Sequence, residues 1–208
     1  MSIFDKKKEN SISGDFPMYD KLKLDVQRLK SSDKRFEIFG TTFHKYEFNP
    51  TLTEDYILKF EENHKIHLPN DYKAFLKEVG NGGAGPHYGM YKLENYYQPR
   101  FYDGSDANYV GDNFLQTPFP YTKSNPFIED DIDEVISGEE YAKEFIKNIS
   151  GAITLAHQGC GYFDMLIVSG EEKGKVWVDA TVSDYGMYCA FNSFTEWYLN
   201  WINVNLEN

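Results

Sequence analysis

The sequence has no apolar run that approaches the roughly 20 residues needed to span a bilayer. Its first residues, MSIFDKKKEN, also lack the apolar core of a secretory signal peptide. Cysteine is scarce, since Cys160 and Cys189 are the only two, whereas a small secreted disulfide scaffold carries more. These absences lead us to expect a cytoplasmic protein without a membrane partner.

Basic residues are few relative to acidic ones, with 21 Lys and Arg against 33 Asp and Glu. The net charge is −12, and because residues 1–35 have a balance of +3, the remainder carries −15. Such a surface repels nucleic acids and anionic membranes and attracts basic partners. Many proteins are acidic only for solubility, so the charge argues against a nucleic-acid partner more strongly than it argues for any other.

Nucleotide and metal signatures are incomplete. Gly80, Gly82 and Gly85 match G-x-G-x-x-G, but the motif follows a helix pattern and precedes a strand pattern, the reverse of a dinucleotide site. The sequence has no His-Glu-x-x-His motif and no paired cysteines for zinc. The acidic run 129–134 lacks the alternating ligands and central glycine of an EF-hand loop. We therefore expect no cofactor and no metal ligands.

His157, Cys160 and Asp164 form the best arrangement for a Cys–His nucleophile. Cys160 lies between two glycines at an expected turn, without a helix N-terminus or a cluster of cations to lower its pKa. We therefore predict a packed turn residue at this position and no catalytic residues in the chain.

The strongest local signals lie in the stretch 68–91. Pro69 suits the first turn of a helix, and apolar residues follow at the spacing of one buried helical face: Tyr72, Phe75, Leu76 and Val79. Gly80 ends this helix, and the glycine-rich hinge 81–86 turns the backbone. We expect a strand to begin within 88–91.

Further helices are predicted by capping patterns. Thr53 caps a helix that runs to about residue 65, and capping boxes begin helices at Ser137 and Ser193. The last of these helices has a strongly aromatic stripe that must pack on other structure. Residues 21–48 are ambiguous between helix and strand, and the aromatic stretch 35–48 is expected to form a hairpin.

Three β-rich runs, 152–156, 163–168 and 175–182, are separated by glycines as in an antiparallel meander. With the helices, they predict an α+β fold: a mostly antiparallel sheet packed by N-terminal helices and a C-terminal helix. We expect residues 1–50 to form a partly irregular N-terminal leader and extension. Residues 51–208 then form one domain with a variable insertion around 92–150.

Several short motifs occur in an order that resembles the SUKH superfamily of Smi/Knr-like proteins. The motifs are Leu68-Pro69, Asp71-Tyr72, Phe75-Leu76, Asn81-Gly82-Gly83, Ile153-Thr-Leu-Ala156, Gly159-Cys-Gly161, Gly174-Lys-Val-Trp177 and Phe194-Thr-Glu-Trp197. The resemblance implies an α+β fold without catalytic residues. It also implies that bacterial members are immunity proteins of polymorphic toxin systems and that fungal relatives regulate cell-wall synthesis.

The leading hypothesis is an immunity protein that binds a cognate secreted toxin domain, expected to be basic, and neutralises it by blocking its active site. The alternative is a non-catalytic regulatory or small-ligand binding module with an aromatic pocket under the hinge at 81–85. An enzyme that uses His157 and Cys160 is the third possibility.

The irregular segment 101–134 is the expected toxin contact, because it lies outside the motifs, is poor in basic residues and is rich in aromatic ones. The candidate contact residues are Tyr102, Asp103, Asp106, Tyr109, Asp112, Glu129, Asp130, Asp131, Asp133 and Glu134. A solvated loop whose aromatic side chains fold inward onto the sheet is the other interpretation.

Overall fold

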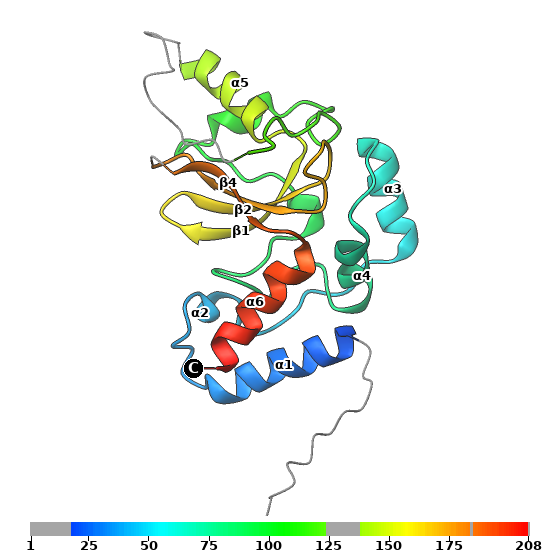
Figure 1. Ribbon diagram of the computed structural model, residues 1–208, viewed down its shortest axis with the longest axis vertical. Helices are drawn as coiled ribbons and strands as arrows, with labels where there is room; N and C mark the ends of the chain where they lie inside the picture. Colours follow the sequence, from blue (N-terminus) through cyan, green and yellow to red (C-terminus); the bar gives the residue numbers. More distant parts are fainter. Residues whose placement is uncertain (1–17, 124–137, 184, 208) are drawn as a thin grey trace, which may run out of the picture.

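The computed structural model describes residues 18–123, 138–183 and 185–207 (Figure 1). The helices of these residues are α1 (Met18–Ser32), α2 (Thr41–His44), α3 (Glu54–His64), α4 (Asn70–Glu78), the short 3-10 helices η1 (Leu93–Asn95) and η2 (Ser105–Tyr109), α5 (Gly138–Asn148) and α6 (Phe194–Leu206). The strands are β1 (Ala152–Gly159), β2 (Tyr162–Ile167), β3 (Val176–Ala180) and β4 (Gly186–Phe191). The α+β class is confirmed.

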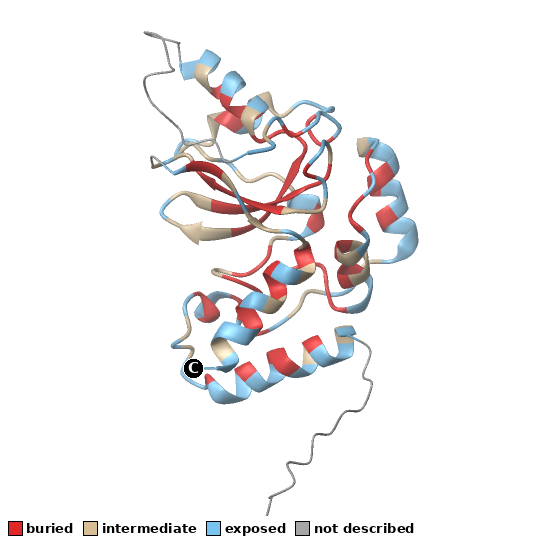
Figure 2. Cartoon of the chain, in the orientation of Figure 1, coloured by how far each residue is buried: buried red, intermediate tan, exposed pale blue. Residues whose placement is uncertain are grey.

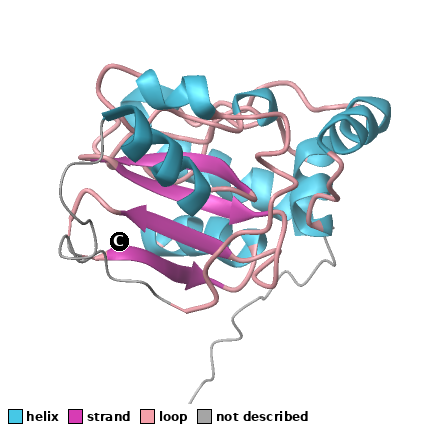
Figure 3. Cartoon of the chain, turned by 90° about the horizontal axis from the view of Figure 1, so that it is seen from above, coloured by secondary structure: helices cyan, strands magenta, loops and turns pink. Residues whose placement is uncertain are grey.

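The strands form one antiparallel meander in the order β1-β2-β3-β4, and they lie side by side in Figure 3. Because side chains alternate between the faces of a sheet, the register separates two sets of residues. Asp164, Val178 and Tyr188 are paired across β2, β3 and β4 and share one face. Phe163 and Asp179, which are also paired, share the opposite face.

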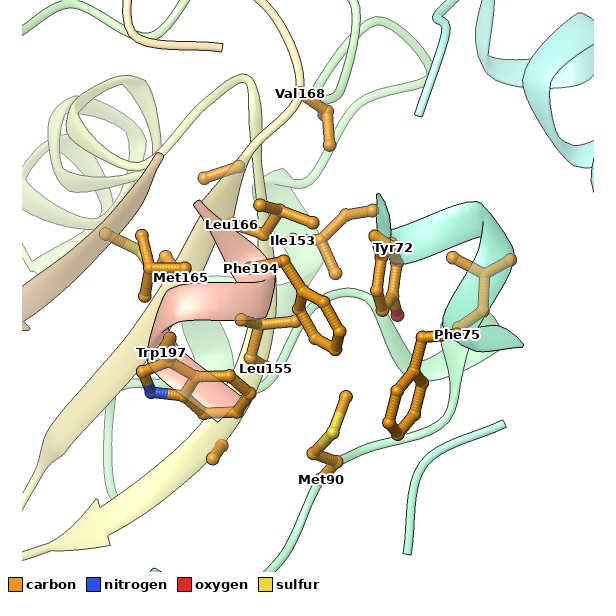
Figure 4. Close-up of a cluster of buried hydrophobic side chains, with 14 of the residues drawn as sticks. Tyr72, Phe75, Met90, Ile153, Leu155, Met165, Leu166, Val168, Phe194 and Trp197 are labelled. Carbon is orange, nitrogen blue, oxygen red and sulfur yellow. The ribbon is translucent and has the colours of Figure 1, made fainter. Parts of the chain in front are cut away.

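Helix α6 covers the first face and lies between the sheet and α1 (Figure 1). Buried residues follow the sheet and one stripe each of α6 and α1 (Figure 2). Figure 4 shows where α6 meets α4: the Phe194 ring lies 4.9 Å from the Tyr72 ring and 5.1 Å from the Phe75 ring. The expected aromatic stripe of the last helix therefore forms the centre of the core.

The segment 93–121 covers the opposite face and is held there by a buried ion pair. Arg100 Nε donates to Asp179 Oδ2 at 2.9 Å, and the Arg100 guanidinium lies 3.8 Å from the centre of the Phe163 ring. Phe119 contacts Trp177 edge-on, with the ring centres 5.0 Å apart. Helix α5 then packs on this segment near η2. The aromatic residues of the segment thus fold largely inward.

The hinge after α4 adds irregular pairing beside β1. Isolated bridges join Phe48 to Gly83, Gly83 to Met90, and Met90 to Ala156 of β1. The strand expected within 88–91 is therefore reduced to Met90, which forms one bridge to Gly83 and another to Ala156. The backbone turns too sharply here for a continuous ladder.

The expected hairpin at 35–48 is wrong, since this stretch forms turns and the short helix α2. The sequence left most of residues 18–32 ambiguous between helix and strand. They form the helix α1, whose Leu22, Val26 and Leu29 join the common core. The predicted boundary between an extension (1–50) and a domain (51–208) stays a prediction. Within the described residues, no helix combines the length and apolar character needed to cross a membrane.

Candidate partner-binding site

A pocket of about 390 Å³ opens between the sheet and α6. Its floor is formed by Asp164, Val178 and Tyr188, which share one face of the sheet. Trp197 and Trp201 of α6 line one wall, because residues four apart lie on the same side of a helix. The volume lies within the range of small-molecule and side-chain binding pockets.

Asp164 is the acidic group of this pocket. Asp164 is 1% exposed, and its Oδ1 accepts a hydrogen bond of 2.8 Å from Gln158 Nε2. Its Oδ2 receives no hydrogen bond from any described residue. His87 Nε2 lies 3.2 Å from Oδ2, but this contact lacks the direction of a hydrogen bond. Because buried polar atoms are normally paired, the free oxygen marks this position as unusual.

The opposite wall includes Ile38 and Phe39, from a loop that is organised by the buried carboxylate of Asp33. Asp33 Oδ1 accepts the backbone N–H of Glu37 at 2.7 Å, and Oδ2 accepts the hydroxyl of Tyr46 at 2.7 Å. Although burial raises the pKa of Asp33, these hydrogen bonds lower it overall. A single carboxylate therefore fixes the loop from both ends.

Gly40 allows this loop to approach the chain at His87. A Cβ built on Gly40 would lie 1.7 Å from the carbonyl oxygen of His87, and its φ of +80° also disfavours other residues. The close approach places Phe39 beside the pocket.

A partly exposed aromatic group adjoins the pocket and is called the aromatic rim: Phe39, Phe43 and the half-buried Tyr88. The ring centre of Tyr88 lies 5.0 Å from that of Phe39 and 4.9 Å from that of Phe43. Phe39 is 56% exposed and Phe43 is 70% exposed. Exposed aromatic side chains that cluster next to a pocket are typical of protein-binding surfaces.

The predicted contact residues on 101–112 have mixed positions. Tyr102, Asp103 and Asp112 are exposed. Asp106 is 0% exposed and accepts hydrogen bonds from Tyr97 Oη and from the backbone N–H groups of Arg100 and Phe101. We therefore leave Asp106 out of the contact surface, because its carboxylate holds the loop together.

Tyr109 is half-buried, and the Lys143 ammonium group lies 5.3 Å from its ring centre. Phe114 and Phe119, from the same segment, are buried. The acidic residues Glu129, Asp130, Asp131, Asp133 and Glu134, with the cap expected at Ser137, lie outside the described residues.

The Cys–His arrangement, which the sequence already disfavoured, does not gather its residues, since His157 and Asp164 lie on opposite faces of the sheet. The His157 ring stacks on the Phe163 ring, with centres 4.6 Å apart, on the face opposite Asp164. Burial lowers the pKa of His157, and nearby Arg100 and His87 add to the effect. Cys160 is exposed at the β1–β2 turn with φ +51°.

The hinge itself is held by side-chain hydrogen bonds. Asn81 is buried, its Oδ1 accepts the Leu93 N–H at 2.8 Å, and its Nδ2 donates to Glu94 at 2.8 Å. Tyr198 Oη donates to the carbonyl of Ala84 at 2.8 Å. Among the described residues, no three His, Cys, Asp or Glu side chains are grouped to hold a metal ion.

The sequence model of the SMI1 / KNR4 family (SUKH-1) matches residues 51–200, which is most of the chain and includes the hinge, the sheet and the first half of α6. The chain belongs to this family. Comparison of the SUKH-1 chain with curated proteins and with solved structures gives no significant match.

The match does not cover the whole pocket. Phe39 and Phe43 precede the matched residues, and Trp201 follows them. Asp164 and Trp197 of the pocket thus lie within the matched residues, whereas Phe39 and Trp201 lie outside them.

The pocket was not predicted from the sequence, because its walls come from positions far apart in the chain. One signal was present: Asp164 interrupts the apolar strand Phe163–Ile167, where a charged residue needs a partner. Phe39 and Phe43 had no signal that distinguished them from core aromatic residues.

Proposed function

We propose that this SUKH-1 protein is a cytoplasmic immunity protein that binds a cognate toxin domain, covers its active site and performs no chemistry itself. The observation that carries the proposal is the aromatic rim beside the pocket of Asp164, a surface suited to a protein partner. The family membership supports it, since the resemblance implies immunity for bacterial members.

The acidic charge supports a basic toxin, because complementary charge speeds association and disfavours wrong partners. We propose separate roles for two regions. The rim and pocket make the central contact. The exposed acids Asp103 and Asp112, with Tyr102, attract the partner from the other side of the sheet. The acidic run 129–134, which lies outside the described residues, adds to this attraction through its charge.

The test is to co-express the chain with the toxin domain encoded by the neighbouring gene. We expect growth to be restored and a stoichiometric complex to form, as measured by size-exclusion chromatography with light scattering. A double variant, His157→Ala with Cys160→Ala, serves as the control and should protect equally, because neither residue does chemistry. Failure of the wild-type chain to bind or protect would refute the proposal. Protection at substoichiometric amounts that requires Cys160 would instead establish an enzyme.

A second candidate is a regulatory module that binds a small ligand. The pocket volume of about 390 Å³ favours it, although the pocket lies beside the hinge rather than under it. A chain that binds a small metabolite and no toxin would support this alternative.

A further inference from the structure

The Asp164 carboxylate differs from every other buried carboxylate that the structure describes. The others are Asp25, Asp33, Glu61, Asp106, Glu172 and Asp179. Each of them has a basic partner or accepts hydrogen bonds, and none of their buried oxygens lacks one. Asp164 accepts a hydrogen bond from Gln158 at Oδ1 and lies 3.2 Å from His87 Nε2, but its buried Oδ2 accepts no hydrogen bond. Of the buried side-chain polar atoms described, only His44 Nε2 and Asp164 Oδ2 lack a hydrogen bond. Leaving a buried carboxylate oxygen without a hydrogen bond lowers the stability of the fold. We therefore expect Asp164 to serve a function at this position.

The surroundings of Asp164 favour a flat cationic group. Trp197 and Trp201 present aromatic surface to the pocket, and among its described lining residues none is Lys or Arg. His87 is the nearest basic group, and its side chain is 32% exposed at the mouth. A guanidinium is planar and weakly hydrated, pairs with carboxylates through fixed N–H groups and stacks on aromatic rings. An ammonium group is a more strongly hydrated point charge and fits this lining less well.

The same protein already holds one guanidinium in this way on the other face of the sheet. Arg100 donates to Asp179, lies 3.8 Å from the Phe163 ring centre and donates to Thr154 Oγ1 at 3.2 Å. Asp164 immediately follows Phe163 and points to the opposite face. The pocket of Asp164 offers the same combination, a buried carboxylate and aromatic rings, without an internal arginine.

We propose that the pocket receives an arginine side chain of the toxin, with the Asp164 carboxylate as the anionic partner of its guanidinium. This inference rests on the proposed immunity function. A protein is the occupant because the aromatic rim, with Phe39 56% and Phe43 70% exposed, adjoins the pocket, and a protein partner would cover both. The negative charge of the chain also favours a basic partner.

The pocket is tested first with short probes. The capped peptide acetyl-Gly-Arg-Gly-amide is titrated into the protein, and the total tryptophan fluorescence, to which Trp197 and Trp201 contribute, is followed. The citrulline peptide, which has the same shape without the charge, is the control. We expect saturable binding of the arginine peptide with a dissociation constant on the order of 1–10 mM and no comparable binding of the citrulline peptide. Equal responses to both peptides, or none to either, would overturn the inference.

Two variants examine the pocket itself. Asp164→Asn keeps the shape of the carboxylate and should weaken arginine-peptide binding by about tenfold or more. Asn200→Arg places a guanidinium at the mouth, from an exposed position on α6, and should block the pocket. Asn203→Arg is the matched control, with the same charge change on the same helix outside the lining, and should bind the peptide normally. Thermal unfolding verifies that each variant is folded. If Asp164→Asn does not fold, the binding of the peptide to Asn200→Arg tests the proposal instead.

The toxin then separates the two proposals. If the wild-type chain binds the toxin, Asp164→Asn and Asn200→Arg should each weaken that complex by about tenfold or more, while Asn203→Arg does not. A folded Asn200→Arg variant that binds toxin with wild-type affinity would overturn the arginine proposal and leave the immunity function intact. A wild-type chain that binds no toxin would refute the proposed function, and the peptide titration would still report on the pocket.

Discussion

At the scale of single residues, His44 is the buried group whose protonation has the clearest consequence. Its Nδ1 accepts the backbone N–H of Tyr46 at 3.0 Å, so the ring is held as a neutral acceptor. Its ring centre lies 5.8 Å from that of Trp201, which joins the Asp33 loop to α6. Burial lowers the pKa of His44 to about 4, although the nearby Asp33 carboxylate works in the opposite direction.

Stability should therefore fall as the pH is lowered from about 6.5 toward about 4. In this window the unfolded chain binds a proton at His44 that the folded chain does not, so acid favours unfolding by up to about 3 kcal/mol at this site. Urea unfolding measured across the window for the wild type and for His44→Asn tests the expectation. The two free energies of unfolding should converge as the pH falls, and parallel curves would contradict the assignment.

The comparison of variants matters because burial also lowers the pKa of His64, and of His157 together with its neighbours. In acid, His64 and His157 lower the free energy of unfolding of the wild type and of His44→Asn alike. Only the component from His44 is removed by the substitution, so the difference between the two curves isolates it.

At the scale of elements, the hinge after α4 depends on glycine. Gly82 has a φ of +76°, and a Cβ built there would lie 2.5 Å from the Tyr91 carbonyl oxygen and 2.7 Å from that of Met90. Both contacts are with backbone, which cannot move aside as the end of a flexible side chain would. Gly82→Ala should therefore lower the free energy of unfolding by about 2 kcal/mol or more.

Chemical denaturation provides the measurement, with Gly111→Ala as the control. A Cβ at Gly111 meets nothing within 4 Å, so this change should have little effect. Equal stability of the two variants would mean that the hinge tolerates a side chain and that its glycines are not required by the backbone.

Local signals predicted the elements whose causes are local. The cap at Thr53 is confirmed, since its side chain accepts the Tyr56 N–H at 3.2 Å, and Ser193 caps α6 by accepting the Glu196 N–H at 3.0 Å. The strand β4 (Gly186–Phe191) was missed because its Gly, Cys and Ala positions give no strong alternation. The stretch 35–48 was misassigned because the side-chain carboxylate of Asp33, just before it, decides its path through hydrogen bonds, and that influence leaves no periodic pattern.

At the scale of the whole molecule, the sheet separates the proposed docking face from a face that carries exposed acids. The pocket and rim lie on the α6 side, whereas Asp103 and Asp112 belong to the segment that covers the other side. Charges attract the partner before the two proteins touch, over about one Debye length, whereas short-range contacts form only after they have met. The two regions should therefore affect different rate constants of the same complex.

Reversal of the acidic run tests this division. Changing Glu129, Asp130, Asp131 and Asp133 to Lys raises the net charge by about 8 units and should slow toxin association by roughly tenfold at low salt. Dissociation should stay close to the wild-type rate, because the run steers the partner rather than forming the central contact. Asp164→Asn should do the opposite, with faster dissociation and little change in association. Surface plasmon resonance at several salt concentrations separates the two rates. A charge-reversed variant that associates at the wild-type rate would exclude the run from steering, and one that dissociates faster would place it in the contact itself.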